Sequence, residues 1–212
     1  MRIKVCGMTS AKNILAVSNC RPDYMGFIFY KGSPRCVNTT LDGAVLKGMP
    51  QGIFKVGVFV NERKDNIRKL NTKYGLDYVQ LHGEESVEYC SILQKEGIRI
   101  IKAVRIDGDI DFGSTLRYAP FIEMFLFDTK GSRRGGTGRK FDWTILDQYS
   151  GQVPFMLSGG ISIDDVHELK EFHHPLFHGV DINSRFETFP GMKDVNLVSG
   201  FIKNIRHAVR SR

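Results

Sequence analysis

The sequence predicts an α/β protein, a single (β/α)8 (TIM) barrel domain over residues 1–212, and three observations lead to that class. Eight short apolar or β-branched runs recur at intervals of about 20 to 30 residues, segments with helical periodicity separate most of them, and the connections are long enough for right-handed crossovers. A chain of 212 residues suits one core, at the lower end for eight such units. A doubly wound sheet is the alternative, but it usually has fewer strands, and no G-x-G-x-x-G motif follows the first strand.

The predicted strands begin near Arg2, Tyr24, Phe54, Tyr78, Ile98, Ile122, Val153 and Phe177. The first helix starts at Ser10, a good N-cap, and places Ile14 and Leu15 on one side. The helix after the third strand starts at Asn61 and stops at Gly75. Its helical spacing buries Ile67, Leu70 and Tyr74.

Two later helices carry equally local signals. Ser162 and Asp165 stand at the N-cap and N3 positions, which is a near capping box. The last helix has apolar residues at positions i, i+3, i+4 and i+7, namely Val198, Phe201, Ile202 and Ile205. No linker, low-complexity segment or domain boundary interrupts the alternation of strands and helices.

The composition is ordinary for a soluble globular protein, with 42% hydrophobic and 25% charged residues. No apolar run approaches the roughly 18 residues of a membrane span, and the N-terminus enters a strand directly, without a charged-then-apolar leader. We therefore expect a cytoplasmic protein without a membrane partner. The four cysteines, Cys6, Cys20, Cys36 and Cys90, form no C-x-x-C pair and are expected to be free thiols.

The net charge of +7 fits a basic soluble surface, attraction of an anionic substrate into a cleft, or binding of nucleic acid. The segments 132–140 and 206–212 are basic, but no known nucleic-acid motif accompanies them, and aromatic residues do not interleave with the basic ones. We expect no nucleic-acid partner.

Polar or glycine-rich residues follow the strands repeatedly. In a barrel these positions lie at one face, where such enzymes keep their chemistry. Each has an ordinary structural explanation when taken alone: a strand-end cysteine is usually a small buried hydrophobe, and an aspartate after a strand often makes a turn. Their common placement favours a site. The residues are Cys6, Arg35, His82, Asp128, Ser158 to Gly160, and Asp181 to Ser184.

The loops after the seventh and eighth strands predict a phosphate site. Gly159 and Gly160 lack a Cβ, so their backbone N–H groups can approach a phosphate closely. The stretch DINSRFE can begin a short extra helix whose N-terminal N–H groups face the same anion. The expected ligand is a phosphorylated substrate.

Seven motifs together resemble those of the phosphoribosylanthranilate isomerase family of tryptophan biosynthesis. In order they are KVCGMT, MGFIFYKGSPRCV, VGVFVN, VQLHGEE, DTKGSRRGGTGRKFDW, LSGGI and GVDINSRFETFPGMKD, and they cover residue 3 to about residue 195. The resemblance implies an Amadori rearrangement of N-(5-phosphoribosyl)anthranilate to 1-(2-carboxyphenylamino)-1-deoxyribulose 5-phosphate. It also implies a small-molecule substrate, neither cofactor nor metal, and a monomer or homodimer.

The same resemblance implies roles for nine residues. The catalytic base falls on Cys6, the catalytic acid on Asp128, and the arginine that contacts the anthranilate on Arg35. His82 and Asp181 fall at substrate-lining positions. The phosphate loops take in Gly159, Gly160, Asn183 and Ser184.

These residue types suit the reaction. An acid must protonate the ring oxygen as the ribose opens, and a base must then remove the C2 hydrogen. A thiol ionises near ~8.5 unless a positive charge helps, and Lys4, two residues before Cys6 on the same inward face, is a candidate helper. Asp128 has to hold a proton near neutral pH, which needs burial or a nearby negative charge.

Two features leave alternatives open. Arg185 stands where the family commonly has a small residue; it could assist phosphate binding or crowd the loop. The glycine-rich loop 129–140 could be a mobile lid or an ordinary loop. The rival functions are another sugar-phosphate isomerase on the same barrel, which would have an aspartate at the end of the first strand, and a binding protein without catalysis. Cys6 disfavours the first, and the presence of both Cys6 and Asp128 disfavours the second.

Overall fold

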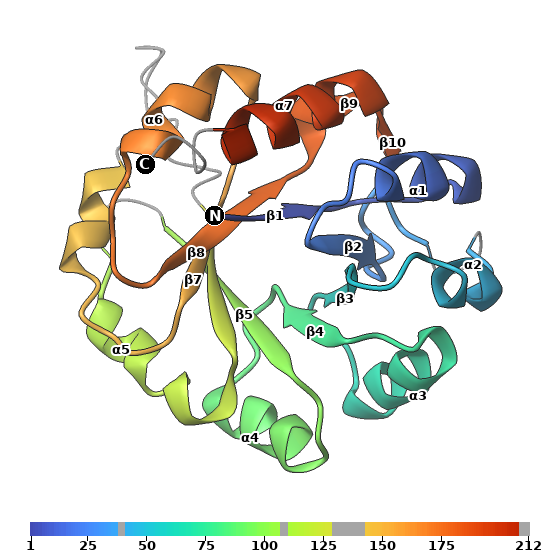
Figure 1. Cartoon of the computed structure of the whole chain (residues 1–212). Coiled ribbons are helices and arrows are strands. Elements are labelled where there is room, and N and C mark those ends of the chain that lie inside the picture. The colour runs from blue at the N-terminus through green and yellow to red at the C-terminus, as the bar shows by residue number, and fades with distance from the viewer. Residues whose placement is uncertain (38–40, 107–109, 129–142, 208–212) are drawn as a thin grey trace.

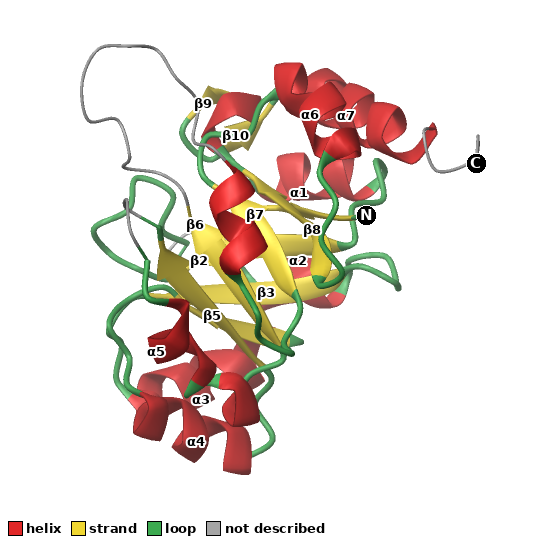
Figure 2. Ribbon diagram, turned by 90° about the vertical axis from the view of Figure 1, so that its left-hand side faces the viewer, coloured by secondary structure: helices red, strands yellow, loops and turns green. Residues whose placement is uncertain are grey.

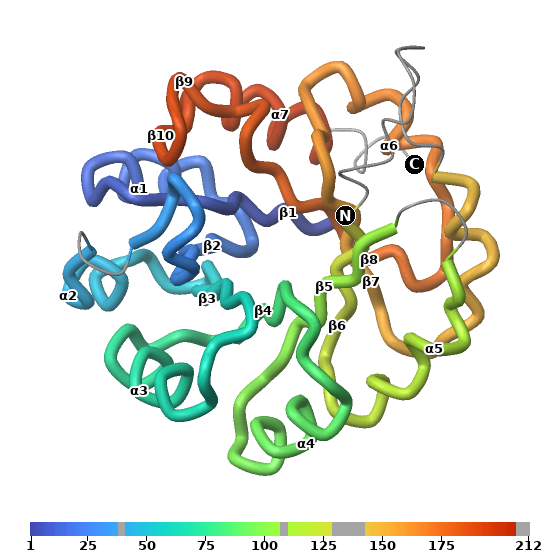
Figure 3. The backbone as a smooth tube through the Cα atoms, turned by 180° about the vertical axis from the view of Figure 1, so that it is seen from behind, coloured from blue at the N-terminus to red at the C-terminus, as the bar shows by residue number. Residues whose placement is uncertain are grey.

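A closed barrel of parallel strands forms the centre of the molecule. The computed structural model describes residues 1–37, 41–106, 110–128 and 143–207. Within these ranges eight strands follow one another around the barrel in chain order, and β1 closes the ring by pairing with β8 in parallel. Figure 1 shows helices around the outside of the strands, and Figure 3 shows the chain circling once, so that its first and last strands meet. The predicted (β/α)8 fold is confirmed.

The barrel strands start where the apolar runs predict, or two residues later. They are β1 (Arg2–Val5), β2 (Tyr24–Ile28), β3 (Phe54–Phe59), β4 (Tyr78–Leu81), β5 (Ile100–Arg105), β6 (Met124–Asp128), β7 (Phe155–Ser158) and β8 (Phe177–Ile182). The strands β5, β6 and β7 begin two residues after the start of their apolar runs. The first residues of these runs precede the hydrogen-bonded strand, and two of them, Ile98 and Val153, are buried there.

Seven α-helices and four 3-10 helices lie in the described ranges. The α-helices are α1 (Ala11–Ser18), α2 (Gly43–Lys47), α3 (Lys64–Tyr74), α4 (Val87–Lys95), α5 (Phe112–Leu116), α6 (Val166–Glu171) and α7 (Val195–His207). The 3-10 helices are η1 (Ala119–Phe121), η2 (Trp143–Gln148), η3 (Ile163–Asp165) and η4 (Ser184–Phe186).

The local helix signals were correct with two exceptions. Gly75 ends α3 in the left-handed conformation at φ 58°, and Ser162 with Asp165 forms the capping box. However, α3 begins at Lys64 and not at Asn61, because Asn61 has a φ of 48° and its side chain accepts a hydrogen bond from Glu84 N across the barrel rim. Leu15 is also half exposed, since α1 buries its neighbours Asn13, Ile14, Val17 and Ser18 instead.

The inside of the barrel changes character along its axis. Apolar side chains of β2 to β7 form one cluster within the ring, and a larger apolar cluster packs between the strands and the helices. The inner cluster comprises Tyr24, Val56, Tyr78, Ile101, Ala103, Met124, Leu126 and Met156. Because side chains alternate along a strand, the same inward face carries Lys4, Gln80 and Asp181 further along, and then Cys6, His82 and Asp128 at the strand ends.

One element was not predicted. After β8 the chain makes the single turn η4 and then a two-stranded hairpin of β9 (Glu187–Phe189) and β10 (Met192–Lys193). Figure 2 shows this hairpin outside the ring of eight strands. It is tied to α1, where Asn13 Nδ2 donates to Lys193 O and Lys193 N donates to Asn13 Oδ1, both at 2.9 Å.

Candidate active site

Four strand ends bring the predicted reactive side chains to one mouth of the barrel. Cys6 directly follows β1 and continues its pairing, since Cys6 N donates to Ile182 O of β8 at 2.9 Å. His82 follows β4, Asp128 ends β6, and Asp181 lies near the end of β8. The carboxyl ends of parallel strands share one edge of a barrel, so residues distant in sequence share one space.

A buried ion pair lies beneath the cysteine. Lys4 Nζ donates to Asp181 Oδ1 at 3.0 Å, and the Lys4 side chain is fully buried. Burial lowers the pKa of Lys4, but the negative charges of Asp181 and Cys6 outweigh it, so the pKa lies above its ordinary value. Lys4 is therefore positively charged inside the barrel.

This pair decides the state of the Cys6 thiol in the free protein. Burial raises the pKa of Cys6, and Lys4 lowers it by less, while the negative charge of Asp181 raises it further. The expected help from Lys4 is thus present, but burial outweighs it, and the negative charge of Asp181 adds to the effect of burial on the pKa of Cys6. The raised pKa favours the thiol over the thiolate form of Cys6 in the free protein.

Gly26 of β2 makes the room that this arrangement needs. A Cβ at Gly26 would lie 2.6 Å from Cys6 Sγ and 3.1 Å from Lys4 Nζ, closer than side-chain atoms approach one another. The absence of a side chain at this inward position therefore lets the thiol and the ammonium group pack side by side.

Asp128 is held by a chain of two polar side chains from β4. His82 Nε2 lies 3.2 Å from Asp128 Oδ2, and His82 Nδ1 lies 2.8 Å from Gln80 Nε2. A Gln80 amide that donates to Nδ1 leaves the ring proton on Nε2, from which it is donated to Asp128. Gln80 Oε1 is the buried side-chain oxygen without a hydrogen-bond partner in the described part of the chain.

Arg35 lies at the mouth but is already engaged. Its Nε donates to both oxygens of Glu187, at 2.8 and 3.0 Å, and its NH2 group donates to Oε2 at 2.5 Å. These contacts raise the pKa of Arg35 above its ordinary value, so its charge is permanent. Gly7, with a φ of 78°, lets Arg35 lie close to the strand end, because a Cβ there would sit 2.7 Å from Arg35 Cδ.

The loops predicted to hold phosphate follow the neighbouring strands β7 and β8. Gly159 and Gly160 have φ angles of 109° and 77°, which L side chains rarely adopt. Ser184, which is exposed, starts η4, so the short helix expected there is a single 3-10 turn. The side-chain oxygen Oδ1 of Asn183 accepts from Lys193 Nζ at 2.7 Å, which ties the turn after β8 to the hairpin.

The structure thus brings the predicted site residues to the same end of the barrel, with Lys4 beside Cys6 as expected, and it adds Gln80, Glu187 and Lys193 to them. The Pro190-Gly191 pair signals a turn, and charged residues flank it, which together could have indicated the hairpin that carries Glu187 and Lys193. Arg185 is exposed to solvent. The loop proposed as a lid, 129–140, and most of the basic segment 206–212 lie outside the described residues.

Two kinds of feature are absent from the residues that the structure describes. No group of three or more His, Cys, Asp or Glu side chains there is placed to hold a metal ion. None of the helices there is long and apolar enough to cross a membrane.

Comparison with known proteins decides the family. The sequence model of N-(5'phosphoribosyl)anthranilate (PRA) isomerase matches residues 3–204, nearly the whole chain. The chain belongs to the phosphoribosylanthranilate isomerase family. Isomerase activity follows from that membership.

Relatives and solved structures of the family agree over their full length. An N-(5'-phosphoribosyl)anthranilate isomerase of Parabacteroides distasonis is 43% identical over 208 residues, covering 98% of this chain and 94% of the relative. The crystal structure of phosphoribosyl anthranilate isomerase from Thermotoga maritima has a TM-score of 0.86 at 35% identity and covers 98% of this chain and 99% of its own. A phosphoribosyl anthranilate isomerase in complex with reduced 1-(o-carboxyphenylamino)-1-deoxyribulose 5-phosphate matches with a TM-score of 0.83 at 32% identity, and the match covers 98% of this chain and 99% of that one.

Proposed function

We propose that this chain converts N-(5-phosphoribosyl)anthranilate into 1-(2-carboxyphenylamino)-1-deoxyribulose 5-phosphate, with Asp128 as the acid and Cys6 as the base. One observation carries the assignment of roles. Cys6 directly follows β1 and Asp128 ends β6 of the same closed parallel barrel, so the thiol and the carboxyl group both lie at the carboxyl-terminal mouth, where Asp181 of β8 pairs with Lys4. This mouth lies above the apolar floor of the barrel.

The reaction needs one proton donated and one removed. Asp128 protonates the ring oxygen while the C1–O bond breaks, which leaves an iminium ion at C1. The iminium acidifies the C2 hydrogen, and the Cys6 thiolate removes it to give an enol-amine. When this enol-amine tautomerises, C1 gains a proton and the C2 hydroxyl loses one. The product is therefore an isomer of the substrate, the protein has given one proton and taken one, and no oxidant or reductant is required.

The surroundings of the two groups suit these roles. The Asp128 side chain is mostly buried, and its Oδ2 lies 3.2 Å from His82 Nε2, so the acid is held in one place at the mouth. Asp181 and Lys4 form the charge pair below the reacting carbon atoms. His82, which contacts Asp128, lines the space and orients the acid.

The two ends of the substrate are anionic, and each has a proposed subsite. Arg35 binds the anthranilate carboxylate. The Gly159–Gly160 loop and the turn at Asn183 and Ser184 bind the phosphate through backbone N–H groups. The Asn183 side chain ties this loop to Lys193.

The activity is tested by anthranilate fluorescence. Freshly generated phosphoribosylanthranilate should lose its fluorescence when the protein is added, and the product should co-elute with 1-(2-carboxyphenylamino)-1-deoxyribulose 5-phosphate. A protein that binds the substrate analogue without turning over the substrate would contradict the proposal and favour the non-catalytic alternative.

The contact of Arg35 with the carboxylate gives a prediction about KM. Arg35→Lys keeps the charge but loses the planar fork, and Arg35→Ala loses both, so KM should rise in both variants while kcat changes less. Arg63, whose side chain is 86% exposed at the start of α3, is the matched control, and Arg63→Ala should leave KM unchanged. An unaltered KM in Arg35→Ala would show that the contact does not exist.

The pKa of Cys6 gives a prediction about pH. Activity needs Cys6 as thiolate and Asp128 as neutral acid, and because burial raises the pKa of Cys6, that pair is a minority form at neutral pH. The profile of kcat/KM against pH should be bell-shaped. On its alkaline limb, above ~8.5, activity should fall as Cys6 ionises, because the pair of Cys6 and Asp128 then loses the one proton that the acid has to donate. The acid limb follows Asp128 and the substrate phosphate, which itself titrates near ~6.

Thiol ionisation followed by ultraviolet absorbance checks this assignment. The signal that is present in the wild type and absent in Cys6→Ser should have its midpoint on the alkaline limb. A midpoint below neutral pH would contradict the raised pKa. A profile without limbs between about pH 5 and 10, with chemistry rate-limiting, would exclude this acid–base pair.

The remaining expectations are proposed together. We propose that residues 1–212 form one domain, since the family match covers residues 3–204 and one closed barrel takes its strands from Arg2 to Ile182. The site draws every proposed residue from one chain, which suits a monomer or a homodimer. We expect a cytoplasmic location, because the Cys6 thiol that the mechanism uses has to stay reduced. We also expect no nucleic-acid partner, since the proposed substrate is a small doubly anionic molecule.

A further inference from the structure

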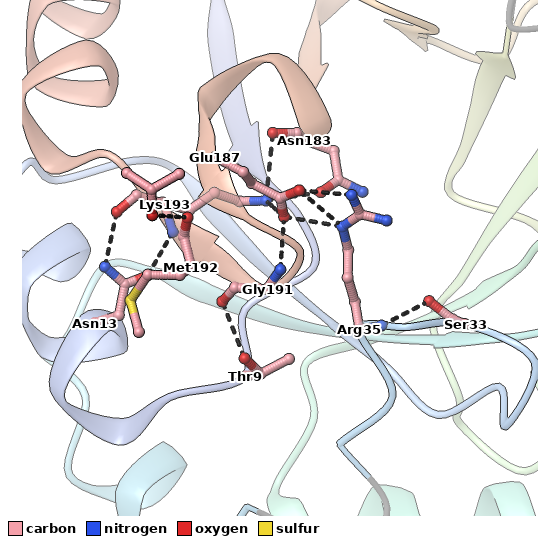
Figure 4. A network of polar contacts seen from close by, with 10 residues as sticks. Thr9, Asn13, Ser33, Arg35, Asn183, Glu187, Gly191, Met192 and Lys193 are labelled. Atoms are coloured by element: carbon pink, nitrogen blue, oxygen red, sulfur yellow. Dashed lines mark hydrogen bonds and ion pairs between the residues drawn. The ribbon is translucent and has the colours of Figure 1, made fainter.

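Glu187, the first residue of the hairpin after β8, has no role in the reaction described so far. Its side chain is almost completely buried, although it is charged. Burial raises its pKa, but the hydrogen bonds from Arg35 and Lys193 outweigh burial and bring the pKa below its ordinary value. The carboxylate is therefore ionised at neutral pH and accepts from Arg35 on one of its sides (Figure 4).

Lys193 holds the same carboxylate from the other side. Lys193 Nζ lies 2.6 Å from Glu187 Oε1, and the backbone N–H of Gly191 donates to the same oxygen at 3.0 Å. Lys193 Nζ also donates to Oδ1 and to the carbonyl oxygen of Asn183, at 2.7 and 3.3 Å. Figure 4 shows the resulting continuous path of polar contacts from Arg35 through Glu187 and Lys193 to Asn183.

The contacts define which edge of Arg35 is left for a ligand. Glu187 takes the edge formed by Nε and NH2, so a second carboxylate has to bind at the edge formed by NH1 and NH2. The Arg35 side chain packs against Gly7, the residue next to Cys6, since a Cβ at Gly7 would lie 2.7 Å from Arg35 Cδ. The guanidinium group is thus fixed beside the base.

We propose that Glu187, itself held by Lys193, is a positioning residue for the isomerisation: it fixes the guanidinium of Arg35 so that the NH1–NH2 edge meets the substrate carboxylate, and it ties this subsite to the phosphate loop at Asn183. The inference rests on the proposed function of Arg35. Because one network joins both subsites, the distance between the two anions of the substrate is set before binding. The reacting C1–C2 unit is then placed between Cys6 and Asp128.

The experiment measures how much a ligand carboxylate contributes to binding. The probes are reduced 1-(o-carboxyphenylamino)-1-deoxyribulose 5-phosphate and the same compound without its carboxyl group. Their ratio of Kd values in the wild type reports the carboxylate subsite. In Glu187→Gln, which is isosteric but uncharged, we expect this ratio to fall by about tenfold, within the range of coupling between contacting residues. KM for the substrate should rise more than kcat falls.

Two further variants keep the test decisive. Glu187→Asp retains the negative charge beside the buried Lys193, so this variant should fold. Its side chain is too short to reach both Lys193 and Arg35, so the ratio of Kd values should still fall, but by less than in Glu187→Gln. In an Arg35→Lys background, Glu187→Gln should not change the ratio further, because the group it positions is gone.

Glu85 is the matched control. It is also a buried glutamate, 3.0 Å from the buried Lys102, and it accepts from backbone N–H groups, but it does not contact Arg35. Glu85→Gln should lower the melting temperature and change the affinities of both probes by the same factor. A wild type that binds both probes equally overturns the role of Arg35 and this inference with it. A wild type that prefers the carboxylate, with an unchanged ratio in Glu187→Gln and Glu187→Asp, overturns this inference alone.

Discussion

Replacing Cys6 with alanine should lower kcat by about 10²–10⁴-fold, because the step that removes the C2 hydrogen loses its base. Two of the other thiols are held elsewhere: Cys90 is buried within α4, and Cys20 Sγ contacts the carbonyl oxygens of Ala16 and Val195. Lys4 is the nearest basic group, but it is charged and paired with Asp181, so it cannot accept a proton. Steady-state kinetics on the purified variant measure the loss.

Cys90→Ala controls for the cost of deleting a buried thiol. Cys90 is fully buried, as Cys6 nearly is, so both variants should lose a comparable small amount of stability, on the order of 1 kcal/mol, when unfolded with denaturant. Cys90→Ala should keep the wild-type kcat. A folded Cys6→Ala protein with wild-type kcat would remove Cys6 from the mechanism.

Replacing Asp128 with asparagine should lower kcat by a similar factor, about 10²–10⁴-fold, for the opposite reason. Asparagine keeps the size of the side chain and can still contact His82, but it has no acidic proton to give to the ring oxygen. The iminium ion then forms slowly, and every later step waits for it. The fluorescence assay should show this as a loss of kcat with a modest change in KM.

Asp77 is the control for removing a carboxylate at a strand end of this barrel. It precedes β4 at the opposite end from Asp128 and bonds Lys55 N, so Asp77→Asn should leave kcat unchanged. A comparison with His82→Asn then separates proton donation by Asp128 from the orientation of Asp128 by His82. His82→Asn should lose less activity than Asp128→Asn, since it removes the partner of the acid and not the acid. Equal kcat values in Asp128→Asn and the wild type would contradict the assignment.

The barrel could be predicted because its signals are local. Each apolar run predicts one strand, and glycine or capping residues such as Gly75 and Ser162 predict where a helix ends or begins. These signals depend only on residues that are close in the sequence. The exceptions follow the same logic. Asn61 looks like a helix start, but a contact with the next loop, at Glu84, turns it away from the helix. Leu15 is apolar in a helix whose buried side is set by neighbouring α7.

The site residues could be named from sequence, but their states could not. Placing Cys6, His82, Asp128 and Asp181 at one mouth needs only the order of parallel strands and the resemblance of their motifs to one family. The hairpin after β8 was missed because its two strands are very short, at Glu187–Phe189 and Met192–Lys193, too short to form a periodic pattern.

By itself the sequence determined the fold class, the family and the identity of the reactive groups, since strand order and motif both lie along the chain. The tertiary structure decided how those groups are charged and aimed. Lys4 and Asp181 are 177 residues apart, and Arg35 and Glu187 are 152 residues apart, yet each pair is in direct contact. Electrostatic energy depends on distance and burial in space, so the thiol state of Cys6 and the bound edge of Arg35 exist only once the barrel has closed.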